Sequence, residues 1–476
     1  MENNNPTTAR AARTFRCEGR SIAVMKLSLF GAAFILSFFH FFIFTSSCWA
    51  QTDSTKANKL SMDLQFLAHG EICAGGLPKP PVNNPDKPEA DLSAFLLGRT
   101  RLSLNYERNW LEAKITLQNN AVWGMRNNMS VDLYEGWVKM KSKNGFFTKI
   151  GRVALSYDDE RIIGPNDFAT ASLSHDVGMV GYEGHGHQIH GIFAFNQNSE
   201  NVYEGTYYDN GSQYYKTMQT VWYHYDFPKF PLGASLLFMN MGIQAGEEGD
   251  TQNPPSTKYQ QMWGTYLKYH PKYLTLEASY YRQTGKTVNE KKQYKPIKAW
   301  MASVKATITP TDHYGFQLGY DYLSGDDFVP VPYGGTAGLP FHEVLKGFSP
   351  LYGSRTKFYG ILDFFYTSAY INGFTPGLQN VYVGAFGNPL PKMRLSVDYH
   401  YLAVATNLSG LSNTLGHNID FNAEYAFSKD VSLSVNYSMM AGTETMTRLK
   451  QENGSKYAHW AWFSLLVSPT LFTTRF

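Results

Sequence analysis

Apolar and polar residues alternate with a period of two over most of the chain beyond residue 50. In residues 431–438 every odd position is apolar or aromatic and every even position is polar, and residues 419–425 repeat the pattern. Segments 60–66, 111–118 and 394–401 alternate in the same way. Because a strand directs successive side chains to opposite faces, this period predicts β-strands with one apolar and one polar face.

These strands fit a transmembrane barrel better than the alternative, a soluble β-sandwich. They are about ten residues long, which is enough to cross a bilayer at a tilt. Their polar faces carry full charges on strand after strand, as a water-filled lumen would allow. Aromatic residues also stand at the ends of the apolar faces, where an interfacial girdle lies. Examples are Tyr399, Tyr401, Tyr425 and Phe427. We therefore predict an all-β fold, a closed antiparallel transmembrane β-barrel, since lipid leaves no strand edge unpaired.

The lengths of the connections predict the number of strands. Eight short turns, such as Pro310–Asp312 and Ser428–Asp430, alternate with nine long loops, which gives about 18 strands with both termini on the periplasmic side. Residues 356–367 also look extended, but a strand there would reverse the alternation of turns and loops that follows. We therefore expect residues 325–377 to form one long loop that folds over or into the lumen.

A single continuous apolar run, Leu27 to Phe44, lies behind five basic residues near the N-terminus. This arrangement predicts a secretory signal peptide over residues 1–50, cleaved after Ala50, and one barrel domain over residues 51–476. A single membrane anchor and a lipoprotein signal at Cys48 are the alternatives. Met25 would begin a signal of more usual length.

Removing residues 1–50 changes the charge of the chain. The full sequence has 42 Lys and Arg against 39 Asp and Glu, and the first 50 residues hold five and two of these, which leaves 37 of each. A neutral mature chain argues against a nucleic-acid partner. Cys73 alone remains, so no intramolecular disulfide can form. The mean hydropathy of -0.33 excludes a bundle of membrane helices and nothing more.

The polar phase of each strand identifies the side chains expected to face the lumen. The basic ones are Arg99, Arg101, Lys114, Arg152, Lys258, Lys268, Lys305 and Arg394, and the acidic ones are Glu107, Glu112, Glu277, Asp321, Asp398, Asp420 and Glu424. This mixed set differs from the Arg and Lys rings of a purely anion-selective pore. Cross-strand pairing that holds the register is an alternative role for each of them.

Several segments resemble the alginate-export family of outer-membrane porins. They are Leu97–Tyr106, Lys149–Pro165, Leu318–Asp326, Phe348–Asp363, Val397–Tyr401 and Leu415–Asp420. The resemblance implies an 18-stranded monomeric barrel in the outer membrane of a Gram-negative bacterium, surrounded by lipid. It also implies a lumen of Arg and carboxylate side chains that passes an anionic polysaccharide, with periplasmic secretion components as further partners. Among the pore-lining residues it favours Arg152, Arg161, Asp321 and Asp326. Val153 and Ala154 depart from the family pattern, and the long loop is diverged.

Other chemistries are weaker alternatives. The His185, His187 and His190 cluster could bind a metal, and the acidic loops at 158–160 and 247–250 could bind Ca²⁺, but solvated turns explain both sets. A barrel-embedded hydrolase would need a nucleophile beside a His, and His400 with Asp398 and Ser396 is the nearest set. No G-x-S-x-G elbow is present.

We therefore predict a channel that is not an enzyme and has no cofactor or metal. A general or nutrient-uptake porin is the alternative to the anionic-sugar channel. Pro469 interrupts the last alternating stretch, so we expect the closing strand to end there and the tail after it to hang free in the periplasm.

Overall fold

The chain divides into two compact units, residues 1–54 and 55–476. The computed structural model describes residues 58–75, 92–125, 129–168, 172–197, 208, 214–246, 251–252, 254–288, 293–326, 343–362, 365, 375–408, 410–450 and 457–476. The predicted signal peptide and the acidic segment 247–250 lie outside these residues. In the described part of the chain no helix is both long and apolar enough to cross a membrane.

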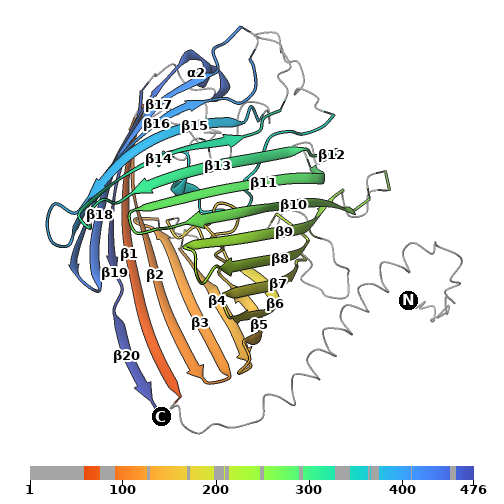
Figure 1. Cartoon of the computed structure of the whole chain (residues 1–476), viewed down its shortest axis with the longest axis vertical. Coiled ribbons are helices and arrows are strands. Elements are labelled where there is room, and N and C mark those ends of the chain that lie inside the picture. The colour runs from red at the N-terminus through yellow and green to blue at the C-terminus, as the bar shows by residue number, and fades with distance from the viewer. Residues whose placement is uncertain are drawn as a thin grey trace, which may run out of the picture. The chain divides into compact units, whose positions relative to one another are not determined.

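The second unit is a closed antiparallel barrel in which strands pair in chain order (Figure 1). The strands are β1 (Lys59–Gly75), β2 (Leu92–Arg108), β3 (Leu111–Val122), β4 (Met129–Lys141), β5 (Phe146–Val153), β6 (His175–Gly184), β7 (His187–Phe195), β8 (Thr217–Asp226), β9 (Leu232–Ala245), β10 (Ser256–Tyr269), β11 (Leu274–Val288), β12 (Tyr294–Pro296), β13 (Ala299–Ile308), β14 (Tyr314–Leu323), β15 (Leu378–Gly387), β16 (Met393–Ala403), β17 (Thr414–Ser428), β18 (Val431–Gly442), β19 (Tyr457–Val467) and β20 (Thr470–Arg475).

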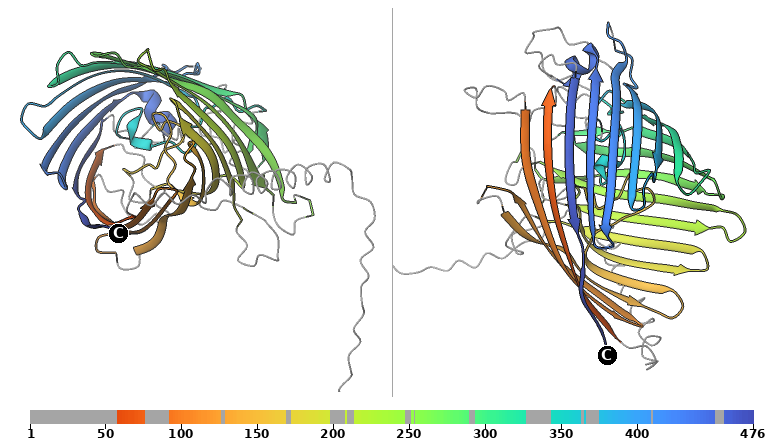
Figure 2. Two further views of the ribbon diagram at one scale, coloured as in Figure 1. Left: turned by 60° about the horizontal axis from the view of Figure 1, so that its bottom comes forward. Right: turned by 90° about the vertical axis from the view of Figure 1, so that its left-hand side faces the viewer.

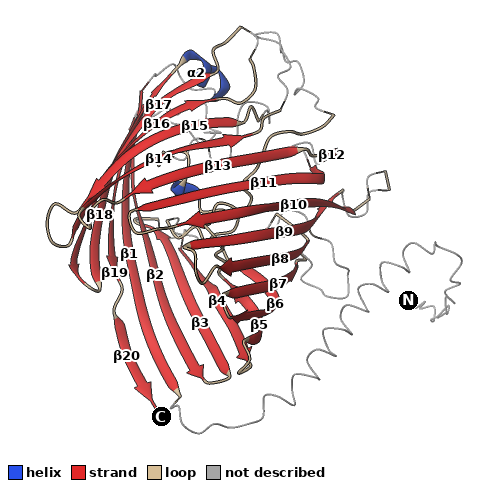
Figure 3. Ribbon diagram, viewed as in Figure 1, coloured by secondary structure: helices blue, strands red, loops and turns tan. Residues whose placement is uncertain are grey.

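Two of these segments are not separate crossings. The short strand β12 pairs with the end of β11 just before β13 takes over, and β20 continues β19 along β1. The ring therefore has 18 strands, as the alternation of short and long connections predicted. Figure 3 shows that strands make up almost all of the described regular structure. The exceptions are the 3-10 helix η1 (Arg355–Lys357) and the helix α2 (Glu444–Lys450).

The long connection between β14 and β15 contains no strand among its described residues. Residues 355–357 form η1 instead, although residues 356–367 look extended in the sequence. Figure 2 shows η1 inside the ring of strands. The pairing of β14 directly with β15 confirms that residues 356–362 do not cross the membrane.

The outward positions of the strands are apolar and exposed. On β13, Val304 is 54% exposed, whereas its neighbour Ser303 is buried on the opposite face. On β14, Leu318 is 56% exposed, whereas Asp321 is buried on the opposite face. Tyr425 and Phe427, expected at the end of an apolar face, are also exposed. Such a surface is stable in contact with lipid and unstable in contact with water.

The inside of the barrel is not wet throughout. Inward positions on β9, β10 and β13 carry Met239, Met241, Met262 and Met301, each with no exposed surface, and they belong to one apolar core with residues of the inward loops. The hydroxyl of Tyr352 from the long loop lies 3.7 Å from the sulfur of Met241. The expectation of a water-filled lumen is therefore wrong on this side, where thioether side chains fill the space between strands and loops.

The barrel closes through its last two strands. β19 pairs with β1 from Phe66 to Gly75, and β20 pairs with residues 59–63 after a shift in register. Pro469 cannot donate to the ladder, but its carbonyl accepts a hydrogen bond from the Leu64 amide at 3.0 Å, so pairing resumes beyond it. The prediction of a free tail after Pro469 is wrong.

Deleting residues 470–476 is expected to leave the start of β1 without a partner and to destabilise the barrel. The measurement is the temperature at which the refolded barrel in detergent loses its compact mobility on a gel. A Leu471→Ala/Phe472→Ala variant is the control, because it keeps the backbone ladder while removing exposed side chains. Equal midpoints for the truncated and the intact chain would contradict the pairing.

Candidate functional site

Two inward loops bind each other inside the ring of strands, and we call this pair the loop clasp. Its members are residues 154–168, after β5, and residues 343–362, after β14. The amide of Gly164 donates to the Tyr352 carbonyl at 2.8 Å, and the Tyr352 amide donates to the Ile162 carbonyl at 3.1 Å. These bonds form a parallel bridge between Ile163 and Tyr352. A short piece of sheet thus joins two loops that are far apart in the sequence.

The clasp holds several residues in a strained backbone conformation. Seven non-glycine residues of the described chain have a positive φ, and five belong to the clasp. These five are Asp158, Glu160, Asn166, Leu351 and Tyr359. Each such residue costs roughly 1–3 kcal/mol and persists only where surrounding contacts over-determine it. Such clustering is typical of functional sites.

Arg161 links the clasp to the barrel wall. Its guanidinium lies 3.2 Å from a carboxylate oxygen of Asp159 and 3.1 Å from Asp321 of β14, and its side chain is 4% exposed. It also donates to the Tyr359 hydroxyl at 3.0 Å and stacks 4.0 Å from the centre of the Phe358 ring. Burial alone would lower the pKa of Arg161, but the charge of Asp321 and the other acidic neighbours outweighs burial and raises that pKa. Arg161 and Asp321, both predicted to line the pore, therefore form a buried ion pair with each other.

Two further carboxylates anchor the long loop. Glu160 accepts hydrogen bonds from Ser354 at 2.8 Å and from Lys357 at 2.5 Å. Asp326 accepts the amides of Lys346 and Gly347 with one oxygen, at 2.6 and 3.0 Å, and the Thr375 amide with the other, at 3.2 Å. Asp326 is 2% exposed, so its role in the structure is to position the loop.

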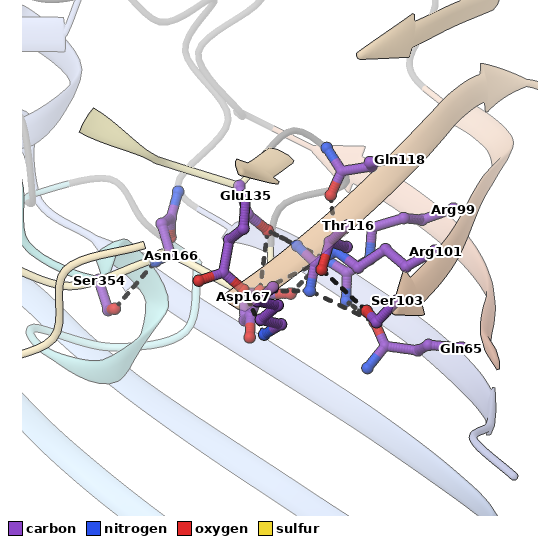
Figure 4. Close-up of polar contacts among 12 residues, drawn as sticks. Gln65, Arg99, Arg101, Ser103, Thr116, Gln118, Glu135, Asn166, Asp167 and Ser354 are labelled. Atoms are coloured by element: carbon purple, nitrogen blue, oxygen red, sulfur yellow. Dashed lines mark hydrogen bonds and ion pairs between the residues drawn. The ribbon is translucent and has the colours of Figure 1, made fainter. Parts of the chain in front are cut away.

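Arg99 and Arg101 lie side by side on the inward face of β2, beneath the clasp (Figure 4). Arg101 donates to a carboxylate oxygen of Asp167 at 2.9 Å, and Arg99 donates to the backbone carbonyl of Asp167 at 2.9 Å. Both also donate to the Ser172 hydroxyl. Figure 4 shows these guanidinium groups converging on Asp167. Two cations of one strand thus contact the same acidic residue, Asp167.

Lysines lie on the inward faces of β3, β4 and β5, next to the arginines of β2. We call the inward faces of β2 to β5 the basic wall. Lys114 pairs with Glu135, Lys141 pairs with Glu112, and Lys139 lies 3.2 Å from Glu183. The ammonium of Lys149 lies 3.7 Å from the centre of the Trp137 ring. Four ammonium groups therefore face three carboxylates here, and an aromatic ring holds the fourth ammonium by a cation–π contact.

Arg152 does not face the lumen, contrary to the sequence prediction. It pairs with Gly136 and Asp176, and its strand neighbour of the same phase, Ile150, is 60% exposed on the lipid side. Its guanidinium forms two hydrogen bonds with Asp176, at 2.8 and 2.7 Å, outside the ring. The opposite phase, which includes Phe147 and Val153, is buried.

Of the other predicted lumen residues, Glu107 lies on β2, Lys258 and Lys268 on β10, Glu277 on β11, and the rest on β13 to β17. Lys305 lies 3.9 Å from Glu277, Asp398 accepts a hydrogen bond from Gln317, and Asp420 accepts one from Ser438. Arg394 stacks 4.7 Å from the centre of the Phe386 ring and is the register partner of Glu424. Whether any of these residues contacts a solute stays a prediction.

The residues considered for metal binding or hydrolysis have the following contacts in the structure. His190 contacts Glu183 and Tyr157, whereas His185 and His187 each contact a tyrosine hydroxyl. No group of three or more His, Cys, Asp or Glu side chains in the described chain could hold a metal. The carboxylates at 158–160 accept hydrogen bonds from protein donors. His400 contacts Asn380 at 2.9 Å and lies 3.7 Å from Asp420, with no contact to Ser396 among the described residues.

Sequence analysis missed a polar set at the barrel seam. His69 of β1 hydrogen-bonds to Ser464 of β19, and its other ring nitrogen lies 3.1 Å from Glu71. These residue types match a hydrolase triad, but Phe168 covers the imidazole edge-on at 5.0 Å and leaves His69 2% exposed. Ser464 is 395 positions from His69, so only the closed ring brings them together.

Replacing Arg161 by Met is expected to destabilise the barrel by about 3–5 kcal/mol, because Asp321 would remain buried without its cation. The double variant Arg161→Met/Asp321→Leu should recover part of this loss. Thermal loss of compact gel mobility measures the effect, with protease cleavage within 343–362 as a second measurement. Lys429→Met in an exposed turn is the control. An unchanged midpoint for Arg161→Met would contradict the role given to this pair.

The clasp is also expected to loosen in acid. Burial would raise the pKa of Glu160 and of Asp167, but hydrogen bonds from Lys357 and Ser354 in the first case, and the charges of Arg101 and Arg99 in the second, outweigh it and lower both. A carboxyl whose pKa is lowered by folding stabilises the folded structure at any pH above its ordinary pKa, which is 4.5 for Glu160 and 3.8 for Asp167. That stability is lost as the pH falls through the lowered pKa of the folded state.

The measurement for this pH effect is single-channel conductance in planar bilayers between neutral pH and about pH 3. Conductance should rise in acid as the loops release each other. A Glu160→Gln/Asp167→Asn variant should start from the higher conductance at neutral pH and respond less to acid. Equal responses of the two proteins would show that these carboxyls do not control the clasp.

Comparison with known proteins identifies the fold. No protein-family model matches the chain, and no curated protein matches it. Among solved structures, Acinetobacter baumannii OccAB1 is similar at 12% identity and a TM-score of 0.56, covering 87% of this chain and 97% of that one. Pseudomonas aeruginosa OccK5 (OpdH) is similar at 12% identity and a TM-score of 0.54, covering 87% and 99%.

These similar structures are outer-membrane porins with 18-stranded barrels. At this level of identity the similarity establishes the fold alone. It does not show membership of the alginate-export family. With its apolar exterior, the chain has the 18-stranded β-barrel fold of Gram-negative outer-membrane porins.

Proposed function

We propose that the chain is an outer-membrane channel that passes anionic sugars or an anionic polysaccharide, as an alginate-export porin does. The observation that carries this proposal is the inward pair Arg99 and Arg101, which shares Asp167 as its nearby carboxylate. Around this pair, a closed ring with apolar residues outside and charged residues inside provides an aqueous path of limited width. The loop clasp narrows that path.

The site formed by Arg99, Arg101 and Asp167 has the chemistry needed to bind a uronate. Asp167 belongs to the chain, yet it presents to the two guanidinium groups the same planar carboxylate that a uronic acid carries. Guanidinium binds carboxylate through paired, charge-assisted hydrogen bonds, which an ammonium cannot reproduce. Asp167 has a side chain that is 56% exposed. Arg99 and Arg101 are themselves buried, so a solute carboxylate would reach them from the water side by displacing Asp167.

A general or nutrient-uptake porin is the second candidate, and one observation favours it. Lysines on the basic wall are paired with carboxylates, as Lys114 is with Glu135 and Lys141 with Glu112. Paired charges attract anions less strongly than the unpaired rings of a selective anion pore. The direction of transport, the monomeric state and the periplasmic partners implied by the family resemblance stay predictions.

The test is single-channel conductance in planar bilayers with added oligogalacturonate. The oligomer is expected to reduce the current through the unmodified barrel, and an Arg99→Gln/Arg101→Gln variant should need about tenfold more of it for the same reduction. Lys429→Gln, in an exposed turn, is the matched control. Absence of any conductance would overturn the channel function. Equal sensitivity of the variant and the control would favour the general porin.

A further inference from the structure

A second polar site is acidic, in contrast to the basic site around Arg99 and Arg101. It lies between the clasp and inward residues of strands β10 to β17. It is a cavity of about 210 Å³, roofed by residues 356–361 and floored by inward side chains of the strands. On this measure one water needs about 10–15 Å³, so the cavity has room for a single sugar ring or one amino acid. Its lining residues all belong to the described chain.

Acidic groups outnumber basic ones in this cavity. Three permanent cations line it, Arg161, Lys305 and Lys357. The lining carboxylates are Asp159, Glu277, Asp321, Asp398 and Asp420.

The cations do not balance these carboxylates. Arg161 serves both Asp159 and Asp321, and Lys357 pairs with Glu160, outside the cavity lining. Lys305 lies 3.9 Å from Glu277, the outer limit of an ion pair. Asp398 and Asp420, which are register partners on β16 and β17, are left without a lining Lys or Arg of their own.

A buried hydroxyl gives an independent sign of a ligand. Ser279 lines the cavity, is 7% exposed, and its Oγ has no hydrogen-bond partner among the described residues. Leaving a buried polar atom unsatisfied costs roughly 1–3 kcal/mol, so such an atom needs an explanation. A bound solute with a hydrogen-bond donor would supply the missing partner.

The spacing of the carboxylates excludes a bare metal ion as the preferred occupant. No three acidic or His side chains of the described residues come close enough together to hold one. Carboxylates spread around a cavity of this size instead match an organic cation, whose ammonium reaches one carboxylate while its hydroxyl groups reach others. Asp398 is suited to the ammonium, because its single described hydrogen bond comes from the neutral amide of Gln317.

We propose that this cavity is a binding site for a small solute that carries a primary ammonium group and hydroxyl groups, such as one amino sugar. Asp398 receives the ammonium, Asp420 and Glu277 supply the negative field around it, and Ser279 bonds to a hydroxyl. This inference goes beyond the anionic-sugar channel, since binding here requires neither conduction nor the Arg99 and Arg101 pair.

The experiment compares D-glucosamine with D-glucose on the purified full-length barrel in detergent micelles at neutral pH and low salt. The two sugars differ only at C2, where glucosamine carries an ammonium and glucose a hydroxyl. Saturation-transfer NMR reports binding without any conductance. Glucosamine is expected to bind at least about tenfold more tightly than glucose, and added salt should weaken its binding.

Variants locate the site. Asp398→Asn, which keeps the shape of the side chain, should reduce glucosamine affinity about tenfold and leave glucose unaffected. Ser279→Ala should weaken both sugars. Asp176→Asn is the matched control, because it removes one carboxylate on the lipid-facing side of the ring.

Equal binding of the two sugars would overturn the proposal, and so would equal effects of Asp398→Asn and Asp176→Asn or stronger binding of D-glucuronate than of glucosamine. Compact gel mobility of each variant at room temperature confirms that it folds. Glu277→Gln replaces Asp398→Asn if the latter does not fold, with the same expected loss of glucosamine binding. Failure here would leave the conductance test of the channel unaffected, because the two experiments use different residues.

Discussion

Backbone hydrogen bonding in lipid is the constraint on which the rest of this structure depends. A strand in the hydrocarbon region has no water to satisfy an unpaired amide, so each strand needs a neighbour on both sides. β1 meets this need by pairing with β2 along almost its whole length and with β19 and β20 on its other edge. The interruption at Pro469 shows how strong the requirement is, because the ladder shifts register and continues instead of ending.

Closing the ring creates a second requirement inside it. Eighteen strands enclose more space than their inward side chains can fill, and the space has to be packed or hydrated. On the side of β9 to β13 it is packed, by methionines and by aromatic residues of the clasp. Burying the clasp brings Arg161 away from water, and Asp321 compensates its charge. The strained residues Glu160 and Tyr359 are held by hydrogen bonds within the clasp.

The sequence predicts features that depend on neighbours along one strand. It does not identify the lumen-facing side of a strand whose two faces have similar polarity. Strand number follows from alternation and loop length because lipid imposes both locally. In β5 the two phases are Phe147, Lys149 and Val153 against Thr148, Ile150 and Arg152, with a charge on each, so the Arg was assigned to the wrong face. Pairs such as Arg161 with Asp321, or His69 with Ser464, join distant segments. No local period can encode them.

Charge in this chain is informative only by position. The lipid-facing surface accepts few charges, so charged residues of the described strands gather inside the ring, as Arg99, Arg101 and Asp420 do. A net charge of zero is compatible with a uniform interior or with separate clusters of opposite sign, and the structure shows clusters: paired guanidinium groups on β2, and a cavity with excess carboxylates beside β16 and β17. Selectivity of the proposed channel would depend on which cluster a solute meets at the narrowest point. Opposite clusters on different walls would orient a zwitterionic solute across the path, because each end is attracted to a different side.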